Sequence, residues 1–176
     1  MEEEKKGRNP QKKMRVSSKT ETATFAAGCF WGVEELFRKL PGVKSTRVGY
    51  TGGKAEKPSY EMVCTGITGH AEALEIVFDP KKTSYAKLLE IFFTNHNPTM
   101  MNRQGWDIGT QYRSAVFYHT AAQRKEAEKA KERAEKEGRW AGKKIVTQIV
   151  PAGVFWEAEE YHQKYLYKKG EKSCHI

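Results

Sequence analysis

The chain has 176 residues, of which 38% are hydrophobic, and a formal net charge of +9. This length and composition suit one globular domain with a sizeable core. Residues 1–19 hold seven Lys or Arg and three Glu, so +4 of the charge lies in this segment and +5 in the remainder. The basic excess therefore does not require a nucleic-acid-binding face, although it can steer acidic partners.

The three cysteines exclude the disulfide framework of small secreted proteins. No Cys-x-x-Cys pair occurs and the five histidines show no chelating spacing, so we expect no zinc site. The amino terminus lacks an apolar leader, and no apolar run approaches the length of a membrane span. We therefore expect a soluble cytoplasmic protein whose cysteines persist as thiols.

Hydrophobic periodicity predicts strands and helices in alternation along the chain. We expect strands at about 22–27, 43–50, 71–78, 114–119 and 145–150, and helices at about 29–40, 84–95, 120–138 and 156–167. Residues 51–70 and 96–112 are rich in turn-forming residues and read as irregular. The first six elements match a ferredoxin-like βαββαβ core. The prediction is an α+β two-layer sandwich with added helices, a flexible charged tail at 1–19, one domain at 20–168 and a mobile tail at 169–176.

Cys29 follows the first predicted strand and precedes the helix of about 29–40. The preceding residue is Gly28, which offers no side chain to the first backbone N–H groups of that helix. Those N–H groups and the helix dipole can instead face a thiolate, which lowers a cysteine pKa and produces a nucleophile. Trp31, beside it, could wall a small apolar pocket. An inert, buried cysteine remains the alternative.

Glu72 lies in the third predicted strand, where alternate residues share a face. It is in register with Leu74, Ile76 and Phe78, which is unusual for a carboxylate. If Glu72 is buried, its pKa rises through desolvation and it can act as a general acid near neutral pH. Otherwise it reaches solvent at the strand end or pairs with a basic residue.

Four further residues lie in irregular segments or at the end of the chain. Tyr60 and Tyr112 each offer an O–H donor to a polar oxygen, or lie with the hydroxyl at the surface. Asp107 is either a site carboxylate or a turn-forming residue between two glycines. Cys174, near the carboxyl end, is either a mobile thiol able to reach a partner sulfur or a bystander. We read Cys64 as structural.

Five blocks in fixed order carry a family resemblance. They are residues 28–32 (GCFWG), 49–53 (GYTGG), 69–73 (GHAEA), 109–114 (GTQYRS) and 161–166 (YHQKYL). Together they resemble the type A peptide methionine sulfoxide reductases over roughly residues 22–167, nearly the whole globular part. The resemblance implies the same α+β sandwich.

The resemblance also implies an activity and roles for the residues above. It implies reduction of methionine S-sulfoxide, free or within proteins, and thus repair of oxidised proteins. Cys29 would be the nucleophile that becomes a sulfenic acid and Glu72 the proton donor, and Tyr60 and Tyr112 would hold the sulfoxide oxygen. The remaining matches are Asp107 in the active site, Phe30 and Trp31 around the substrate methyl group, and Cys174 as the resolving cysteine. A thioredoxin would recycle the disulfide, and we expect a monomer without cofactor, metal, membrane or nucleic acid.

Two other classes of function remain open on the residues alone. A cysteine hydrolase would pair Cys29 with a histidine base such as His70 or His162. A nucleic-acid-binding module would use the basic excess, but the sequence lacks the interleaving of aromatic and basic residues on a strand that such modules use. We rank the second alternative last.

Overall fold

The computed structural model describes residues 19–171. A six-stranded sheet in the order β7-β6-β1-β3-β2-β8 forms its centre. The six strands are β1 (Glu21–Ala27), β2 (Val43–Thr51), β3 (Ala71–Phe78), β6 (Ser114–Tyr118), β7 (Gln148–Pro151) and β8 (Trp156–Glu157). All neighbouring strands are antiparallel except β6 and β7. The inner order β6-β1-β3-β2, with β3 between β1 and β2, confirms the predicted split βαβ core.

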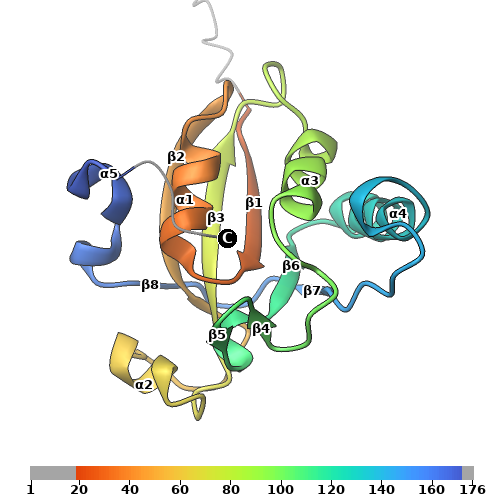
Figure 1. Cartoon of the computed structure of the whole chain (residues 1–176). Helices are drawn as coiled ribbons and strands as arrows, with labels where there is room; N and C mark the ends of the chain where they lie inside the picture. The colour runs from red at the N-terminus through yellow and green to blue at the C-terminus, as the bar shows by residue number, and fades with distance from the viewer. Residues whose placement is uncertain (1–18, 172–176) are drawn as a thin grey trace, which may run out of the picture.

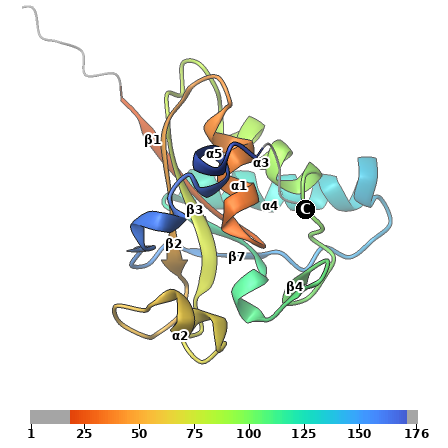
Figure 2. The same cartoon turned by 60° about the vertical axis from the view of Figure 1, so that its left-hand side comes forward.

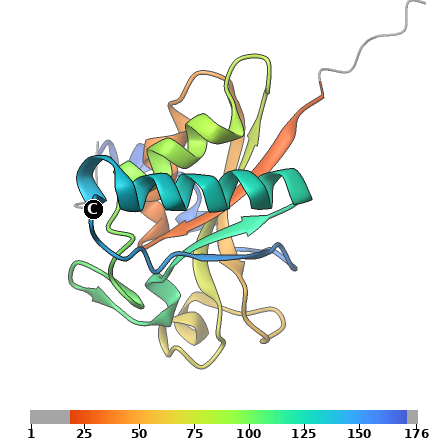
Figure 3. The ribbon, with the colours of Figure 1, turned by 90° about the vertical axis from the view of Figure 1, so that its right-hand side faces the viewer.

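Three helices cover one face of this sheet. They are α1 (Phe30–Arg38), α3 (Tyr85–Thr94) and α4 (Ala121–Lys136), and Figure 3 shows α3 and α4 side by side across the sheet. Ser84 and Thr120 accept hydrogen bonds from the first turns of α3 and α4, as N-cap residues do. The narrow alanine face of α4 packs inward through Ala127, which is fully buried. The predicted α+β two-layer fold is therefore confirmed.

The large core lies between the helices and the sheet. Alternate residues of β1 and β3 point into it, namely Ala23, Phe25, Ala27, Leu74, Ile76 and Phe78. A second, smaller cluster on the other face consists mainly of alanines and Phe117. Phe155 packs on that second face, in the segment that crosses from β7 at one edge to β8 at the other (Figure 1). The alternation predicted for β3 is confirmed, so Glu72 belongs to the helix-covered face.

The prediction of one helix over residues 156–167 is wrong. The segment forms β8, a 3₁₀ helix η3 (Glu160–His162) and a short helix α5 (Tyr165–Lys169). The Gln163 side chain accepts the Val48 N–H and donates to the Val48 carbonyl oxygen, each at 2.9 Å. This side chain therefore makes the hydrogen bonds to the edge of β2 that the backbone of a neighbouring strand would make. Hydrogen bonds to a distant strand therefore replace those of a local helix.

The two segments predicted to be irregular contain short elements. Residues 51–70 include α2 (Tyr60–Cys64), which Ser59 caps. Residues 96–112 form the hairpin β4 (Arg103–Gln104) and β5 (Asp107–Ile108), followed by the 3₁₀ helix η1 (Thr110–Tyr112). The last predicted strand also begins later than expected, at Gln148.

The chain order brings these segments to one end of the sheet. The β1–α1 turn, the β2–β3 connection with α2, and the α3–β6 connection with the β4–β5 hairpin all lie at the lower end in Figure 1 and again in Figure 2. In this core β1 and β2 run in one direction, and β3 and β6 run in the opposite direction. The ends of β1 and β2 therefore lie at the same end of the sheet as the starts of β3 and β6, which is where these three connections lie. None of the helices within residues 19–171 has the length and apolar character needed to cross a membrane.

Candidate active site

Cys29 is the N-cap residue of α1, and its side chain makes no capping hydrogen bond. Gly28 before it has φ +90°, and a Cβ there would lie 2.7 Å from Cγ of Gln104, so only glycine fits this turn. Cys29 is partly exposed, unlike the inert buried cysteine considered as an alternative. The thiol therefore lies at the amino-terminal end of a helix, where the dipole favours a negative charge.

Glu72 is buried directly beneath this helix end. Its side chain is 2% exposed, and Oε1 accepts the backbone N–H of Phe30 at 3.2 Å. Oε2 is buried and has no hydrogen-bond partner among residues 19–171. Burial raises the pKa of Glu72 to about 8, with a further rise from the Asp107 charge, against the opposing effect of the Phe30 N–H. The carboxyl group is therefore mostly protonated at pH 7, as a general acid must be.

Two phenols and one carboxylate lie close to Glu72. Burial raises the pKa of Tyr112 most, followed by the charges of Glu72 and Asp107. Burial likewise raises the pKa of Tyr60, and the Glu72 charge adds to it. Both hydroxyls therefore stay protonated and can donate hydrogen bonds. Asp107 itself is exposed on the β4–β5 hairpin.

Comparisons with known proteins show which family the chain belongs to. A family model described as "Peptide methionine sulfoxide reductase" matches residues 21–176. "Peptide methionine sulfoxide reductase MsrA" of Methanothermobacter thermautotrophicus is 55% identical over 163 residues, 93% of this chain and 96% of that protein. The protein of the same name from Geobacter sulfurreducens is 54% identical over 161 residues, 92% of this chain and 99% of the relative.

The chain belongs to the peptide methionine sulfoxide reductase family.

Solved structures of this family share the fold. The reduced form of Mxr1 from Saccharomyces cerevisiae has a TM-score of 0.83 at 41% identity, and the match covers 90% of each chain. Methionine sulfoxide reductase A of Corynebacterium diphtheriae has a TM-score of 0.81 at 38% identity, over 88% of this chain and 77% of that one. The α+β sandwich that the resemblance implied is therefore confirmed.

The two aromatic residues after Cys29 differ in their surroundings. Phe30 is fully buried, with its ring 5.8 Å from Tyr50 and 5.1 Å from His162. Trp31 is partly exposed and stacks on Tyr165, with ring centroids 3.8 Å apart and planes inclined by 9°. Trp31 thus packs against the C-terminal segment of the reductase, a contact that the sequence does not predict.

Of the other two cysteines, one lies within the described residues. Cys64, which we expect from the sequence to be structural, is exposed at the end of α2. The Tyr60 hydroxyl donates a hydrogen bond to the Cys64 side chain, which contributes to raising the pKa of Tyr60, and the Cys64 charge contributes to raising that of Tyr112. Cys64 therefore lies next to the two candidate phenols of the reductase. Cys174 lies outside the described residues.

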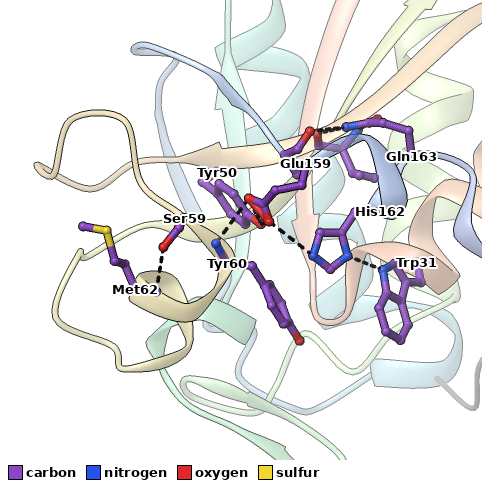
Figure 4. Close-up of polar contacts among 10 residues, drawn as sticks. Trp31, Tyr50, Ser59, Tyr60, Met62, Glu159, His162 and Gln163 are labelled. Carbon is purple, nitrogen blue, oxygen red and sulfur yellow. Dashed lines mark hydrogen bonds and ion pairs between the residues drawn. The ribbon is translucent and has the colours of Figure 1, made fainter.

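Sequence reasoning missed Glu159 and Tyr165, and it named His162 without predicting the contact of that residue with Trp31. His162, Glu159 and Tyr165 come from the C-terminal segment and contact residues of α1 and α2. The block at 161–166 was a signal for two of them, but nothing in its local pattern indicates contact with Trp31. Figure 4 shows Glu159 and His162 between Tyr60 and Trp31.

No group of three or more His, Cys, Asp or Glu within residues 19–171 is arranged to hold a metal ion. A cavity of about 350 Å³ lies between α3 and α4, and none of the candidate site residues lines it.

Proposed function

We propose that the protein reduces methionine S-sulfoxide to methionine, in proteins and as the free amino acid, with thiols as the source of electrons. One observation carries the proposal. A carboxyl group with a pKa of about 8 is buried against the first backbone N–H of the helix that follows Cys29. A nucleophile and a protonated acid are thereby held at one helix terminus, which is what oxygen transfer from a sulfoxide requires.

The reaction begins when the Cys29 thiolate attacks the sulfoxide sulfur. Glu72 gives its proton to the sulfoxide oxygen, and Tyr60 and Tyr112 donate hydrogen bonds to the same oxygen. The oxygen then moves from the substrate sulfur to Sγ of Cys29 and the sulfur–sulfur bond formed by the attack breaks, so methionine leaves and Cys29 becomes a sulfenic acid. The sulfoxide is reduced by two electrons, and the cysteine is oxidised by two.

Three further residues complete the proposed site. Asp107 keeps Glu72 protonated, because its negative charge raises the pKa of that group. Phe30 and Trp31 enclose the substrate methyl group with apolar surface. The selectivity for the S epimer is carried over from the family.

Recycling requires a second thiol. Cys174 condenses with the Cys29 sulfenic acid, forming a disulfide and releasing water, and a thioredoxin-type dithiol then reduces that disulfide by exchange. Mxr1 of Saccharomyces cerevisiae has been solved in complex with Trx2, with a TM-score of 0.61 at 32% identity to this chain over 85% of it. We infer that this monomeric, cytoplasmic protein repairs oxidised methionine in other proteins.

The proposal is tested with purified protein, dithiothreitol as the only reductant, and the two epimers of methionine sulfoxide supplied separately. We expect consumption of the S epimer alone. Cys29→Ser should fall below about a hundredth of the wild-type rate, because serine cannot form a sulfenic acid. Cys64→Ser is the matched control and should keep its rate with dithiothreitol. A cysteine hydrolase would consume neither epimer, so absence of turnover would overturn the proposal.

A further inference from the structure

Exposed apolar side chains gather at the end of the sheet that holds the proposed site. Among residues 19–171, eight large apolar or aromatic residues are exposed, and five of them belong to the connections 51–70 and 96–112. These five are Met62, Ile67, Met101, Trp106 and Ile108, and we call them the apolar rim. Trp106 is the extreme case and is 96% exposed. Single exposed apolar residues are common, but their gathering around one feature indicates an interaction surface.

The two connections that carry the apolar rim flank the site. Asp107, the residue after Trp106, raises the pKa of Glu72 by its charge, so the hairpin of β4 and β5 lies beside the acid. The Glu72 charge in turn raises the pKa of Tyr60, the first residue of α2. Figures 1 and 2 show α2 and β4 on opposite sides of the lower end of β3. A polypeptide that brings one side chain to Cys29 therefore has its neighbouring residues next to the rim.

Hydrogen bonds hold the hairpin that carries Trp106. The Gln104 side chain accepts the Asn97 N–H at 2.9 Å and donates to the carbonyl oxygen of the same residue. The Arg103 guanidinium donates to the Gly105 carbonyl oxygen at 2.7 Å, within the turn between the two strands. An indole on such a fixed backbone binds a partner with a small loss of conformational entropy, as the aromatic anchors of interfaces do.

The charge of the rim indicates the kind of partner that it fits. Residues 51–70 hold two Lys and two Glu, and residues 96–112 hold one Arg and one Asp, so both connections are formally neutral. The chain as a whole carries +9. An acidic partner is therefore drawn to other parts of the surface, whereas the rim suits an uncharged apolar segment.

Polypeptide segments that contain oxidised methionine have this apolar character. Methionine is among the residue types that are most often buried, and its oxidation to a polar sulfoxide disrupts the core around it. A segment that becomes exposed in this way carries the apolar neighbours of the methionine with it. The partner that fits the rim is thus the chain of the damaged protein itself.

We propose that the apolar rim binds the residues that flank methionine sulfoxide in a polypeptide, with Trp106 as the anchor for an apolar side chain. This inference rests on the proposed function, because the reacting residue brings its neighbours to the rim. Trp106 is then a specificity-determining residue that takes no part in the chemical step. An oxidised methionine between apolar residues is a better substrate than one between polar residues, and the preference depends on the indole.

Two capped pentapeptides with the S-sulfoxide at the centre test the preference, one with leucine and one with serine on both sides. With dithiothreitol as the reductant, kcat/KM of the wild type should be about tenfold higher for the leucine peptide, the scale of one buried apolar contact. Trp106→Ser should remove this advantage through KM and leave the serine peptide and free methionine S-sulfoxide unchanged. Trp106→Tyr keeps an aromatic ring and should recover most of the loss.

Two controls separate this role from a merely structural one. Tyr167→Ser removes another exposed aromatic ring, which lies against Arg38 at the last turn of α1, and it should match the wild type with every substrate. The alkaline decline of activity that Glu72 imposes should keep its midpoint in Trp106→Ser, since the acid is undisturbed. Urea unfolding midpoints of all variants identify any that fail to fold.

A binding measurement does not depend on turnover. In Cys29→Ser, which cannot form a sulfenic acid, the leucine peptide should shift the Trp106 indole N–H signal in nuclear magnetic resonance spectra, and the serine peptide should shift it far less. The signal is identified by its absence when Trp106→Ser is added to Cys29→Ser. If the wild type reduces no sulfoxide but these shifts appear, the proposed function fails and the peptide-binding surface stands.

Three results would overturn the inference. The first is equal kcat/KM for the two peptides in the wild type. The second is a loss in Trp106→Ser that appears only with a thioredoxin-type protein as the reductant, which would assign the rim to that protein. The third is a dimer in sedimentation that Trp106→Ser dissociates, which would assign the rim to a second copy of the chain.

Discussion

Glu72 and the backbone of Phe30 are hydrogen-bonded across 42 residues of sequence, with Oε1 accepting the Phe30 N–H at 3.2 Å. This bond attaches β3 to the first turn of α1, one residue after Cys29. It lowers the pKa of the carboxyl group, but burial and the Asp107 charge raise it more, to about 8. The bond therefore positions the Glu72 carboxyl group at the start of α1, while the group stays mostly protonated at neutral pH.

Glu72→Gln should slow the first turnover of methionine S-sulfoxide by about a hundredfold or more, the usual scale for a general acid. In the wild type, the rate should decline as the pH rises through about 8, because the carboxyl group then loses the proton that it must give. The decline should be absent from the residual activity of the variant. Rapid-quench kinetics between pH 6 and 10 measure both, with the exposed Glu90→Gln as control. A wild-type rate in Glu72→Gln would assign the proton to another group.

Asp107→Asn should move the alkaline decline of activity to lower pH. The Asp107 charge raises the pKa of Glu72, so its removal lowers that pKa. The change should be less than about one pH unit, because burial is the larger cause. The same rapid-quench profile provides the measurement. A midpoint that rises or does not move would mean that the two carboxyl groups do not interact.

Glu72 should also make the stability of the protein depend on pH. Its pKa rises from 4.5 to about 8 on folding, so between these values the folded state holds a proton that the unfolded state lacks. Raising the pH must therefore reduce the free energy of unfolding, by up to about 1.4 kcal/mol per pH unit. Relative to Glu72→Gln, the wild type should lose stability steadily in urea unfolding from pH 5 to pH 8. Parallel curves for the two proteins would show that Glu72 is not buried as described.

A count of thiols after one turnover tests the pairing of Cys29 with Cys174. The chain starts with three thiols, and excess methionine sulfoxide without a reductant should leave one. An unresolved sulfenic acid would leave two thiols and react with dimedone, and a hydrolase would keep all three. Peptide mapping should link Cys29 to Cys174 and not to Cys64. Cys174→Ser should keep the first turnover and lose recycling by thioredoxin; retained recycling would contradict the assignment.

The sequence by itself determined the features that depend on neighbouring residues. A strand, a glycine and an amphipathic run predict that Cys29 lies at a helix start, and strand alternation places Glu72 with Leu74 on one face. These predictions hold because the periods of strands and helices are local properties of the backbone. The order of the elements also predicted the split βαβ core, since few topologies connect them without crossing.

Only the tertiary structure decided how those features meet. Alternation could not tell whether Glu72 reaches solvent, because burial depends on which helix covers the face. Local pattern favoured a helix at 156–167, but the Gln163 side chain pairs with the edge of β2 instead. The contact between Trp31 and His162 joins residues 131 positions apart. Such contacts form when polar groups of distant segments meet in the interior and become hydrogen-bond partners. The local sequence pattern does not indicate which partner each group will meet.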